Sequence, residues 1–588
     1  MVAKGERRIA DGEGRRANRY PLLAIRYWLF CSWPLVLCSW LFVLCPLPGE
    51  AAEKVAFARR GVVVCENPRA ADIGADILRQ GGNAVDAAVA VGFALAVLFP
   101  QAGNVGGGGF MIIYRPDSEA YALDFREQAP SQATPDMYLD PAGNVIPDLS
   151  THGYLAVAVP GTPAGLFEAH RRFGRLPWPR LLRPAIELAA RGFETDTSLY
   201  LALRRDRDRL LKDPEFARIF FDGTEPKGRI VQPELARTLR TLAAQGAQGF
   251  YTGWVAEAIE EAMRRHGGRV TREDLAEYRP LWREPVQFSV GDATVFSMPL
   301  PSAGGWMLKF MFTVLENLRT PDVGWHSALH VNLVVEAAKQ AYAERAHHMG
   351  DPDRVPFPTF LDTPAYFRAM AQKIRPYRVQ PAEAVRPTLR PLYEESPETT
   401  HYSVLDAQGM AVAVTYTLND LFGAGVIVPG TGILLNNEMD DFSLKPGVPN
   451  LYGLTGGDAN AVGPRKRMLS SMTPTVVVRD GQVLGLLGSP GGATIVTTVY
   501  QVLENLLIFR MEPFLALTAP RFHHQWMPDE IRYEPTAFSG DTLRVLQGLG
   551  YRLQPVPALG RVQMIWQWQD GYLGLSDPRS PGSAAGWR

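Results

Sequence analysis

A switch from helix-and-turn sequence to strand sequence at Thr399 constrains this 588-residue chain more than any other feature. Residues 376–398 hold five prolines and mixed charge, and they read as an exposed linker that is open to cleavage. The sequence before this linker is dominated by helix and turn patterns, whereas the sequence after it contains successive hairpins. The first interpretation of such a break is a domain boundary.

The segment after the break has the pattern of a β-hairpin. Residues 401–405 and 410–417 are strand-like, and the turn residues 407–409 separate them. Because the two arms are centred near one turn, Thr399 and Thr417 fall opposite each other. Facing residues on paired strands have Cβ atoms about 5 Å apart. We therefore predict that the hydroxyls of Thr399 and Thr417 come within hydrogen-bonding reach.

The rest of the chain predicts an α+β fold. Two further hairpins are expected around Asp480-Gly481 and Asp570-Gly571, with a helix over 494–509 between them. Further helices are expected over 70–80, 84–98 (capped by Asn83), parts of 163–265 and 326–348, with strands at 110–114 and 286–296 and a loop at 299–305. Hairpins that alternate with helices favour antiparallel sheets covered by helices.

Four consecutive glycines, 106–109, invite comparison with a phosphate-binding loop. Their spacing matches neither the dinucleotide fingerprint nor the P-loop, which requires Lys-Ser or Lys-Thr after the glycines. The better interpretation is that the backbone packs closely against another segment here.

The N-terminus carries a basic region followed by an apolar run over residues 27–47. A signal peptide with a cleavage site near Ala51 fits this pattern. The run is about 20 residues, so an uncleaved membrane anchor fits too. Both alternatives place residues 1–52 outside the folded body. Both predict export, to a periplasmic or extracellular location.

Composition excludes some classes of function. The net charge is −1 and acidic and basic residues are mixed, which gives no basic stripe for nucleic acid. The histidine pairs 347–348 and 523–524 lack ligand spacing, so we expect no metal and no cofactor. His401 lies within a predicted strand, and a packed histidine is favoured there over a catalytic base.

Several motifs accompany the threonine hairpin in a fixed order. They comprise residues 81–88, 124–127, 399–403, Thr417, Asn419, 440–443, 470–475 and 489–492. This set closely resembles the gamma-glutamyltransferase (gamma-glutamyltranspeptidase, glutathione hydrolase) family from about residue 55 to residue 579. The resemblance implies an N-terminal-nucleophile hydrolase fold, a four-layer αββα sandwich. It also implies a precursor that cuts itself into two subunits.

The resemblance places the cut between Glu398 and Thr399. It implies a large subunit over 53–398 and a small catalytic subunit over 399–588, which together form a heterodimer. Thr399 becomes the nucleophile, and its new α-amine becomes the base for its own hydroxyl. Thr417 hydrogen-bonds that hydroxyl.

The resemblance also implies how substrate binds. The substrates are glutathione and other γ-glutamyl compounds, and the acceptors are water, amino acids or peptides. The α-carboxylate is expected to contact Arg126, Ser470 and Ser471, and the α-amine is expected to contact Asn419, Glu438 and Asp441. The N–H groups of Gly491 and Gly492 are expected to stabilise the oxyanion. Tyr452 is expected in a lid loop over residues 446–453.

Two alternatives remain open at this point. One is an acylase of the same family that prefers glutaryl side chains of β-lactams, which lack the α-amine. The other is a family member that never matures and serves as a binding or scaffold protein. Taken singly, each site residue also has an ordinary structural explanation, since a Thr-Thr pair in a strand is common.

Overall fold

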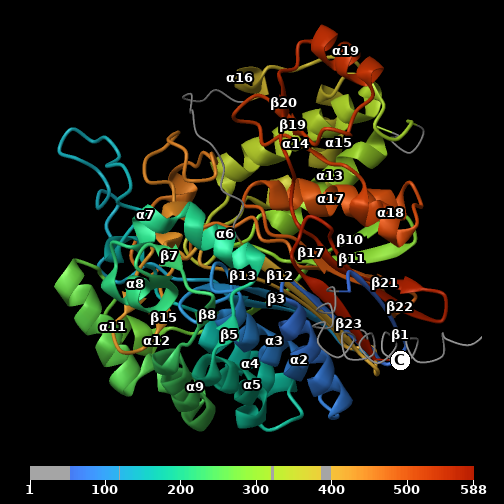
Figure 1. Ribbon diagram of the computed structural model, residues 1–588. Coiled ribbons are helices and arrows are strands. Elements are labelled where there is room, and N and C mark those ends of the chain that lie inside the picture. The colour runs from blue at the N-terminus through green and yellow to red at the C-terminus, as the bar shows by residue number, and fades with distance from the viewer. Residues whose placement is uncertain (1–52, 118, 319–322, 386–398, 588) are drawn as a thin grey trace, which may run out of the picture. The chain divides into compact units, whose positions relative to one another are not determined.

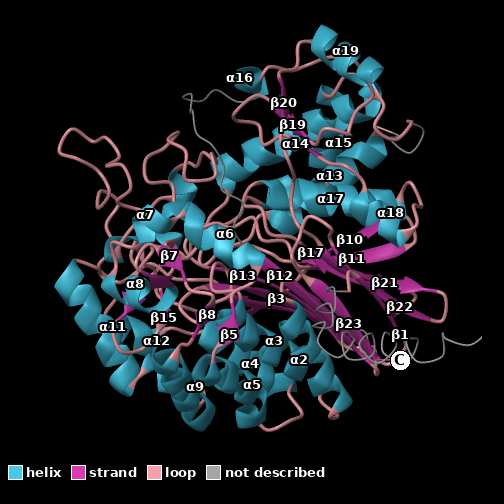
Figure 2. Ribbon diagram, in the orientation of Figure 1, coloured by secondary structure: helices cyan, strands magenta, loops and turns pink. Residues whose placement is uncertain are grey.

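Two antiparallel seven-stranded sheets stack face to face, and helices cover the outer side of each sheet (Figure 1). The computed structural model describes residues 53–117, 119–318, 323–385 and 399–587. The predicted leader (1–52) and Glu398 lie outside the described residues. The layer order is helix, sheet, sheet, helix (Figure 2), which confirms the predicted αββα sandwich.

The first sheet contains the threonine hairpin at its centre. Its strand order is β23 (Ser583–Trp587), β2 (Gly61–Cys65), β12 (Thr400–Asp406), β13 (Ala411–Thr417), β3 (Gly108–Tyr114), β4 (Ala120–Phe125) and β9 (Leu281–Arg283). The hairpin strands β12 and β13 come from the C-terminal third of the chain. Their outer neighbours β2 and β3 come from the first fifth, so segments far apart in sequence form one sheet.

The second sheet contains the other two predicted hairpins. Its strand order is β1 (Val55–Ala58), β22 (Gly571–Ser576), β21 (Gln563–Trp568), β17 (Gln482–Gly488), β16 (Thr475–Arg479), β11 (Ala293–Ser297) and β10 (Val286–Val290). The pairs β16–β17 and β21–β22 are joined by tight turns, as the Asp-Gly signals predict.

Helices from different parts of the sequence form the two outer layers. The layer on the first sheet includes α2 (Pro68–Arg79), α3 (Ala84–Leu98), α5 (Trp178–Arg191) and α9 (Pro233–Gln245), and the layer on the second includes α13 (Gly304–Asn317), α14 (Ala328–His348) and α17 (Thr494–Leu507). Asn83 caps α3 in a reciprocal capping box with Asp86. Every residue of α3 is buried, as its apolar composition predicts.

The register of the β12–β13 hairpin agrees with the prediction. Thr400 pairs with Tyr416 and His401 pairs with Thr415, so Thr399 faces Thr417. Tyr402 points into the helical layer, whereas His401 points between the sheets, since successive side chains in a strand alternate. His401 is packed rather than catalytic: its Nδ1 lies 2.7 Å from Thr415 Oγ1, and burial lowers its pKa to about 3.

The glycine run packs against backbone, as predicted. A Cβ atom on Gly107 would lie 2.0 Å from the carbonyl oxygen of Thr417, and one on Gly109 would lie 2.4 Å from that of Thr415. No side chain fits at these distances. The run therefore lets β3 lie close to β13, where it supports the position of Thr417.

The linker prediction is wrong in part: residues 376–385 are mostly exposed, as predicted, but their backbone is held by neighbouring side chains. Residues 382–385 form a helical turn, α16 (Ala382–Val385), and the preceding backbone is tied to the helical layer. Tyr377 N donates to Asn332 Oδ1 at 2.8 Å, and Lys339 Nζ donates to the Gln380 carbonyl at 2.6 Å. The physical reason is that buried polar side chains of α14 form hydrogen bonds with this backbone. Residues 386–398 lie outside the described residues.

Within residues 53–117, 119–318, 323–385 and 399–587, no helix has both the length and the apolar character that a bilayer crossing requires. The apolar run at 27–47 lies outside these residues.

The close approach at Gly107 leads to a stability prediction. Gly107→Ala forces the backbone of β3 away from Thr417 and should lower the free energy of unfolding by about 1–3 kcal/mol or more, measured as a fall in Tm. Gly228→Ala is the matched control, because nothing lies within 4 Å of a Cβ there. Equal Tm values for the two variants would contradict the packing role of the glycine run.

Candidate active site

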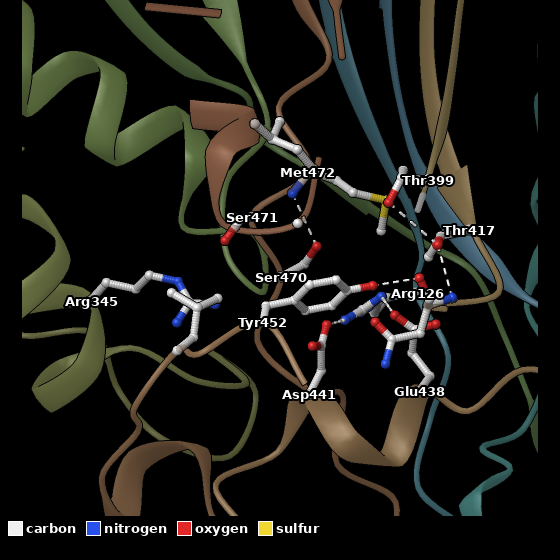
Figure 3. Close-up of a pocket in the computed structure, with 14 residues that line it drawn as sticks. Arg126, Arg345, Thr399, Thr417, Glu438, Asp441, Tyr452, Ser470, Ser471 and Met472 are labelled. Atoms are coloured by element: carbon white, nitrogen blue, oxygen red, sulfur yellow. Dashed lines mark hydrogen bonds and ion pairs between the residues drawn. The ribbon is translucent and has the colours of Figure 1, made fainter. Parts of the chain in front are cut away.

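Thr399 and Thr417 lie at one side of a small cavity that is built at the ends of strands from both sheets (Figure 3). Their hydroxyl oxygens are 3.5 Å apart, and Thr399 is 4 % exposed. The Thr417 oxygen also accepts a hydrogen bond from the Asn419 backbone N–H at 2.8 Å. The Thr399 hydroxyl, directly before the central strand β12, is therefore held by a second hydroxyl whose own position is fixed.

The cavity is small, with about 290 Å³ of empty space among its atoms. Its lining residues are Arg126, Arg345, Thr399, Thr417, Asn419, Glu438, Asp441, Tyr452, Leu454, Ser470, Ser471, Met472, Gly492 and Ile495. The structure thus brings together nearly all the predicted site residues; Gly491 is next to Gly492 but is not among the lining residues.

A largely buried ion cluster forms one wall of the cavity. Arg126, at the end of β4, pairs with Glu438, and its Nη2 lies 2.5 Å from Asp441 Oδ2. Its Nη1 is also 3.5 Å from Glu127 Oε2. One guanidinium is therefore surrounded by three carboxylates. These carboxylates hold it in place, and it partly offsets their charge.

Burial and the charges of neighbouring side chains shift the pKa values of the ion cluster. Burial raises the pKa of Glu438 well above its usual range, and Glu127 and Asp441 raise it further. Burial likewise raises the pKa of Glu127 to about 7. Burial alone would lower the pKa of Arg126, but Glu438 and Asp441 outweigh it and raise that pKa. Arg126 is therefore always charged, whereas the acids around it take up protons at a higher pH than ordinary carboxyls.

Ser470 and Ser471 are held by the loop at 299–305. The Ser470 N–H donates to the Pro301 carbonyl at 2.8 Å, and the Ala303 N–H donates to the Ser470 carbonyl at 2.9 Å. Ser470 Oγ accepts a hydrogen bond from the Met472 N–H. Ser471 Oγ, in contrast, is buried and has no hydrogen-bond partner within the described part of the chain. An unpaired buried hydroxyl at the wall of a cavity is available to a ligand.

Gly492 and Tyr452 close another side of the cavity. Gly491 and Gly492 precede α17, where backbone N–H groups carry partial positive charge. A Cβ on Gly492 would lie 2.4 Å from the Tyr452 ring, so only glycine allows this contact. The Tyr452 hydroxyl donates to the Asn419 carbonyl. The aromatic ring is thus fixed across the cavity.

The loop that carries Tyr452 is tied to the acidic residues beneath it. Asn450 Nδ2 donates to Asp441 Oδ1 at 2.9 Å, and the Leu451 N–H donates to Asp440 Oδ2 at 2.7 Å. Asp441 therefore joins the ion cluster to the loop. A change in its charge would affect both.

Sequence reasoning did not identify Glu127 and Arg345. Glu127 directly follows Arg126, so its position next to a predicted substrate contact was enough to predict that it lies near the site. Arg345 lies in α14, a helix in which several polar residues, including Lys339 and Glu344, are buried. Because α14 buries polar residues on most of its sides, the sequence pattern does not distinguish its buried polar positions from exposed ones. Arg345 is therefore recognised as a cavity residue only in the structure.

Removing the central cation should destabilise the protein in a pH-dependent way. Arg126→Met leaves buried carboxylates without a counter-ion, which costs about 3–5 kcal/mol. The raised pKa values mean that protonation relieves this cost at low pH, so the fall in Tm should be larger at pH 8 than at pH 5.5.

Thermal unfolding at the two pH values measures this effect. Arg229→Met is the matched control, because Arg229 and its partner Glu194 are both largely exposed, and its Tm should change little. A fall in Tm for Arg126→Met that does not depend on pH would contradict the electrostatic account of the cluster.

Known proteins share both the sequence and the fold. The family model described as Gamma-glutamyltranspeptidase matches residues 70–587. The Glutathione hydrolase proenzyme of Escherichia coli strain K12 is 46 % identical over 529 residues, which are 89 % of this chain and 91 % of that protein.

Two solved structures are also similar. The cephalosporin acylase from Bacillus halodurans has a TM-score of 0.78 at 28 % identity, covering 92 % of this chain and 98 % of that one. The gamma-Glutamyltranspeptidase of Helicobacter pylori has a TM-score of 0.54 at 41 % identity, covering 60 % of this chain and 100 % of that one. The chain therefore belongs to the gamma-glutamyltranspeptidase family.

Proposed function

We propose that this protein is a gamma-glutamyl acyltransferase and glutathione hydrolase whose nucleophile is Thr399. The observation that carries the proposal is one small cavity that holds the facing hydroxyls of Thr399 and Thr417 together with the Arg126 ion cluster. Family membership and the name of the E. coli relative support the same activity.

Maturation begins with a cut before Thr399. A threonine hydroxyl is a weak nucleophile at neutral pH and needs a base. An internal threonine has no free amine, so its hydroxyl first attacks the Glu398 carbonyl carbon. The peptide C–N bond breaks as an ester forms, and water then hydrolyses that ester. The products are the Glu398 carboxylate and a new chain that begins with Thr399, in keeping with the word proenzyme in the relative's name.

The two pieces remain together as a heterodimer. β12 and β13 lie between β2 and β3 in the first sheet, and β16 and β17 lie next to β11 in the second. Both sheets therefore combine strands from before and after the cut. Separation would expose the apolar interior of the sandwich, which is strongly unfavourable.

The free α-amine of Thr399 then serves as the base in catalysis. It takes the proton of the Thr399 hydroxyl as the oxygen attacks the γ-carbonyl carbon of substrate. The N–H groups of Gly491 and Gly492 stabilise the oxyanion, a contribution of about 3–4 kcal/mol for each donor. The leaving amine receives the proton as the C–N bond breaks. A γ-glutamyl ester of Thr399 remains, and water or an amine acceptor resolves it.

The charged wall selects the α-amino-acid end of the substrate. The α-carboxylate binds at Arg126, Ser470 and Ser471, and the α-ammonium binds at Asn419, Glu438 and Asp441. Burial raises the pKa values of both acids, and an incoming ammonium favours their ionised forms. The small cavity accepts the γ-glutamyl group, while the leaving part of glutathione extends outward.

Tyr452 is proposed as the lid residue that limits the access of water. Its loop is fixed by hydrogen bonds to Asp440 and Asp441 through neighbouring residues. Gly447 and Gly453 both have positive φ and provide hinge positions. Opening of this loop admits substrates and the amino-acid or dipeptide acceptor.

The acylase alternative is weaker for a specific reason. A glutaryl group lacks the α-amine and would leave the carboxylates Glu438 and Asp441, which line the cavity, without an ammonium partner. Comparable turnover of glutaryl and γ-glutamyl anilides would favour the acylase.

Export is proposed from the leader alone. The basic region and the apolar run over 27–47 direct the body to a periplasmic or extracellular location, either released or held by an N-terminal membrane anchor.

Cleavage and turnover should depend on the same hydroxyl. Denaturing gels of the wild-type protein should show two fragments, and N-terminal sequencing of the smaller should read Thr-Thr-His-Tyr. Thr399→Ala should abolish both cleavage and turnover of a γ-glutamyl anilide, whereas Thr399→Ser should retain part of each. A single uncut, inactive wild-type band would support the non-catalytic alternative.

A further inference from the structure

The cavity contains a second cation, Arg345, to which the proposed function assigns no role. Arg345, in the last turn of α14, is 4 % exposed and lines the cavity. Among the described residues its guanidinium forms no ion pair, and its Nε is buried without a partner. Burial lowers its pKa to about 10, so it remains charged at neutral pH. The nearby Asp441 carboxylate opposes this lowering of the pKa, but Asp441 already pairs with Arg126. A further anion would therefore stabilise the buried Arg345 guanidinium.

Arg126 offers little unoccupied hydrogen-bonding capacity for such an anion. Its Nε donates to the Met468 carbonyl at 3.3 Å, and its two terminal nitrogens pair with Glu438 and Asp441. A substrate carboxylate that met Arg126 alone would lie next to several acidic side chains. Repulsion from them would offset much of the attraction of one guanidinium.

Ser471 supplies the second half of a carboxylate site. Ser471 lines the same cavity as Arg345. Neither its hydroxyl nor the Arg345 Nε has a hydrogen-bond partner among the residues that the structure describes. A hydroxyl and a guanidinium together provide donors for both oxygens of a carboxylate. In the view of Figure 3, Ser471 lies on the Arg345 side of the cavity, and Thr399 lies at the opposite side.

This arrangement matches the layout of a γ-glutamyl group. The γ-carbonyl must reach the Thr399 hydroxyl, and the α-carboxylate lies at the far end of the same group. Arg345 adds a second positive charge to a site in which three acidic side chains surround Arg126. The acids on the Arg126 side remain available to the α-ammonium of the substrate.

We propose that Arg345, together with Ser471, binds the α-carboxylate of the substrate as a second cation beside Arg126. Arg345 is then a residue that determines specificity for α-amino-acid substrates. This inference rests on the proposed function.

Two anilides that differ by one carboxylate test the proposal. γ-Glutamyl-p-nitroanilide carries the α-carboxylate, whereas 4-aminobutanoyl-p-nitroanilide has the same amine and the same reacting amide without it. Arg345→Met should lower kcat/KM for the first by about 10- to 100-fold, the range for loss of a charged hydrogen-bond partner. The loss should be mainly a rise in KM, and the second anilide should change by less than about 3-fold.

Matched variants keep this test decisive. Arg368→Met alters an exposed arginine and should change neither anilide. Denaturing gels verify that each variant is cut before it is assayed. If Arg345→Met stays uncut, Arg345→Lys is assayed instead. The proposal then requires a larger fall in kcat/KM for γ-glutamyl-p-nitroanilide than for 4-aminobutanoyl-p-nitroanilide.

The outcomes separate this inference from the proposed function. Equal losses for both anilides, or no loss for either, would overturn the role of Arg345 alone, provided that the wild type turns over γ-glutamyl-p-nitroanilide. Wild-type protein that turns over neither anilide would overturn the proposed function and this inference with it.

Discussion

The pairing of β12 with strands on both of its sides is the constraint on which the rest of the site depends. β12 follows Thr399, and it pairs with β13 on one side and with β2 on the other. A strand held on both edges stays in place when the bond before it breaks. The break in sequence character at Thr399 is therefore not a domain boundary: the residues on its two sides build the same two sheets.

The ion cluster depends on this framework in turn. Arg126 extends from the end of β4, two strands away from β13, and Glu438 and Asp441 come from the segment that follows the hairpin. Because these side chains are largely buried, separating their charges costs much free energy. The ion cluster therefore keeps its wall of the cavity in a fixed position relative to Thr399. Asp441 also accepts a hydrogen bond from Asn450, so the loop carrying Tyr452 responds to the same charges.

Local patterns in the sequence were enough to predict the hairpin register, the cap at Asn83 and the close packing of the glycine run. Each of these depends on neighbouring residues or on strict alternation. The ion pairs of Arg126 with Glu438 and Asp441 were not predictable from local patterns, because these two acids come from a segment more than 300 residues away in the sequence. Arg345 was hidden for a related reason: α14 buries polar residues around most of its circumference. The tie between residues 377–380 and α14 was missed because the partners are again buried polar side chains of that helix.

The covalent intermediate is the most direct test of the central claim that Thr399 is the nucleophile. The protein would be mixed with a γ-glutamyl anilide, quenched in acid during turnover, digested and analysed by mass spectrometry. We expect the mass of one γ-glutamyl group on the peptide that begins at Thr399, with fragmentation placing it on the threonine side chain. A γ-glutamyl adduct on any other residue, or turnover with no adduct on that peptide, would contradict the account.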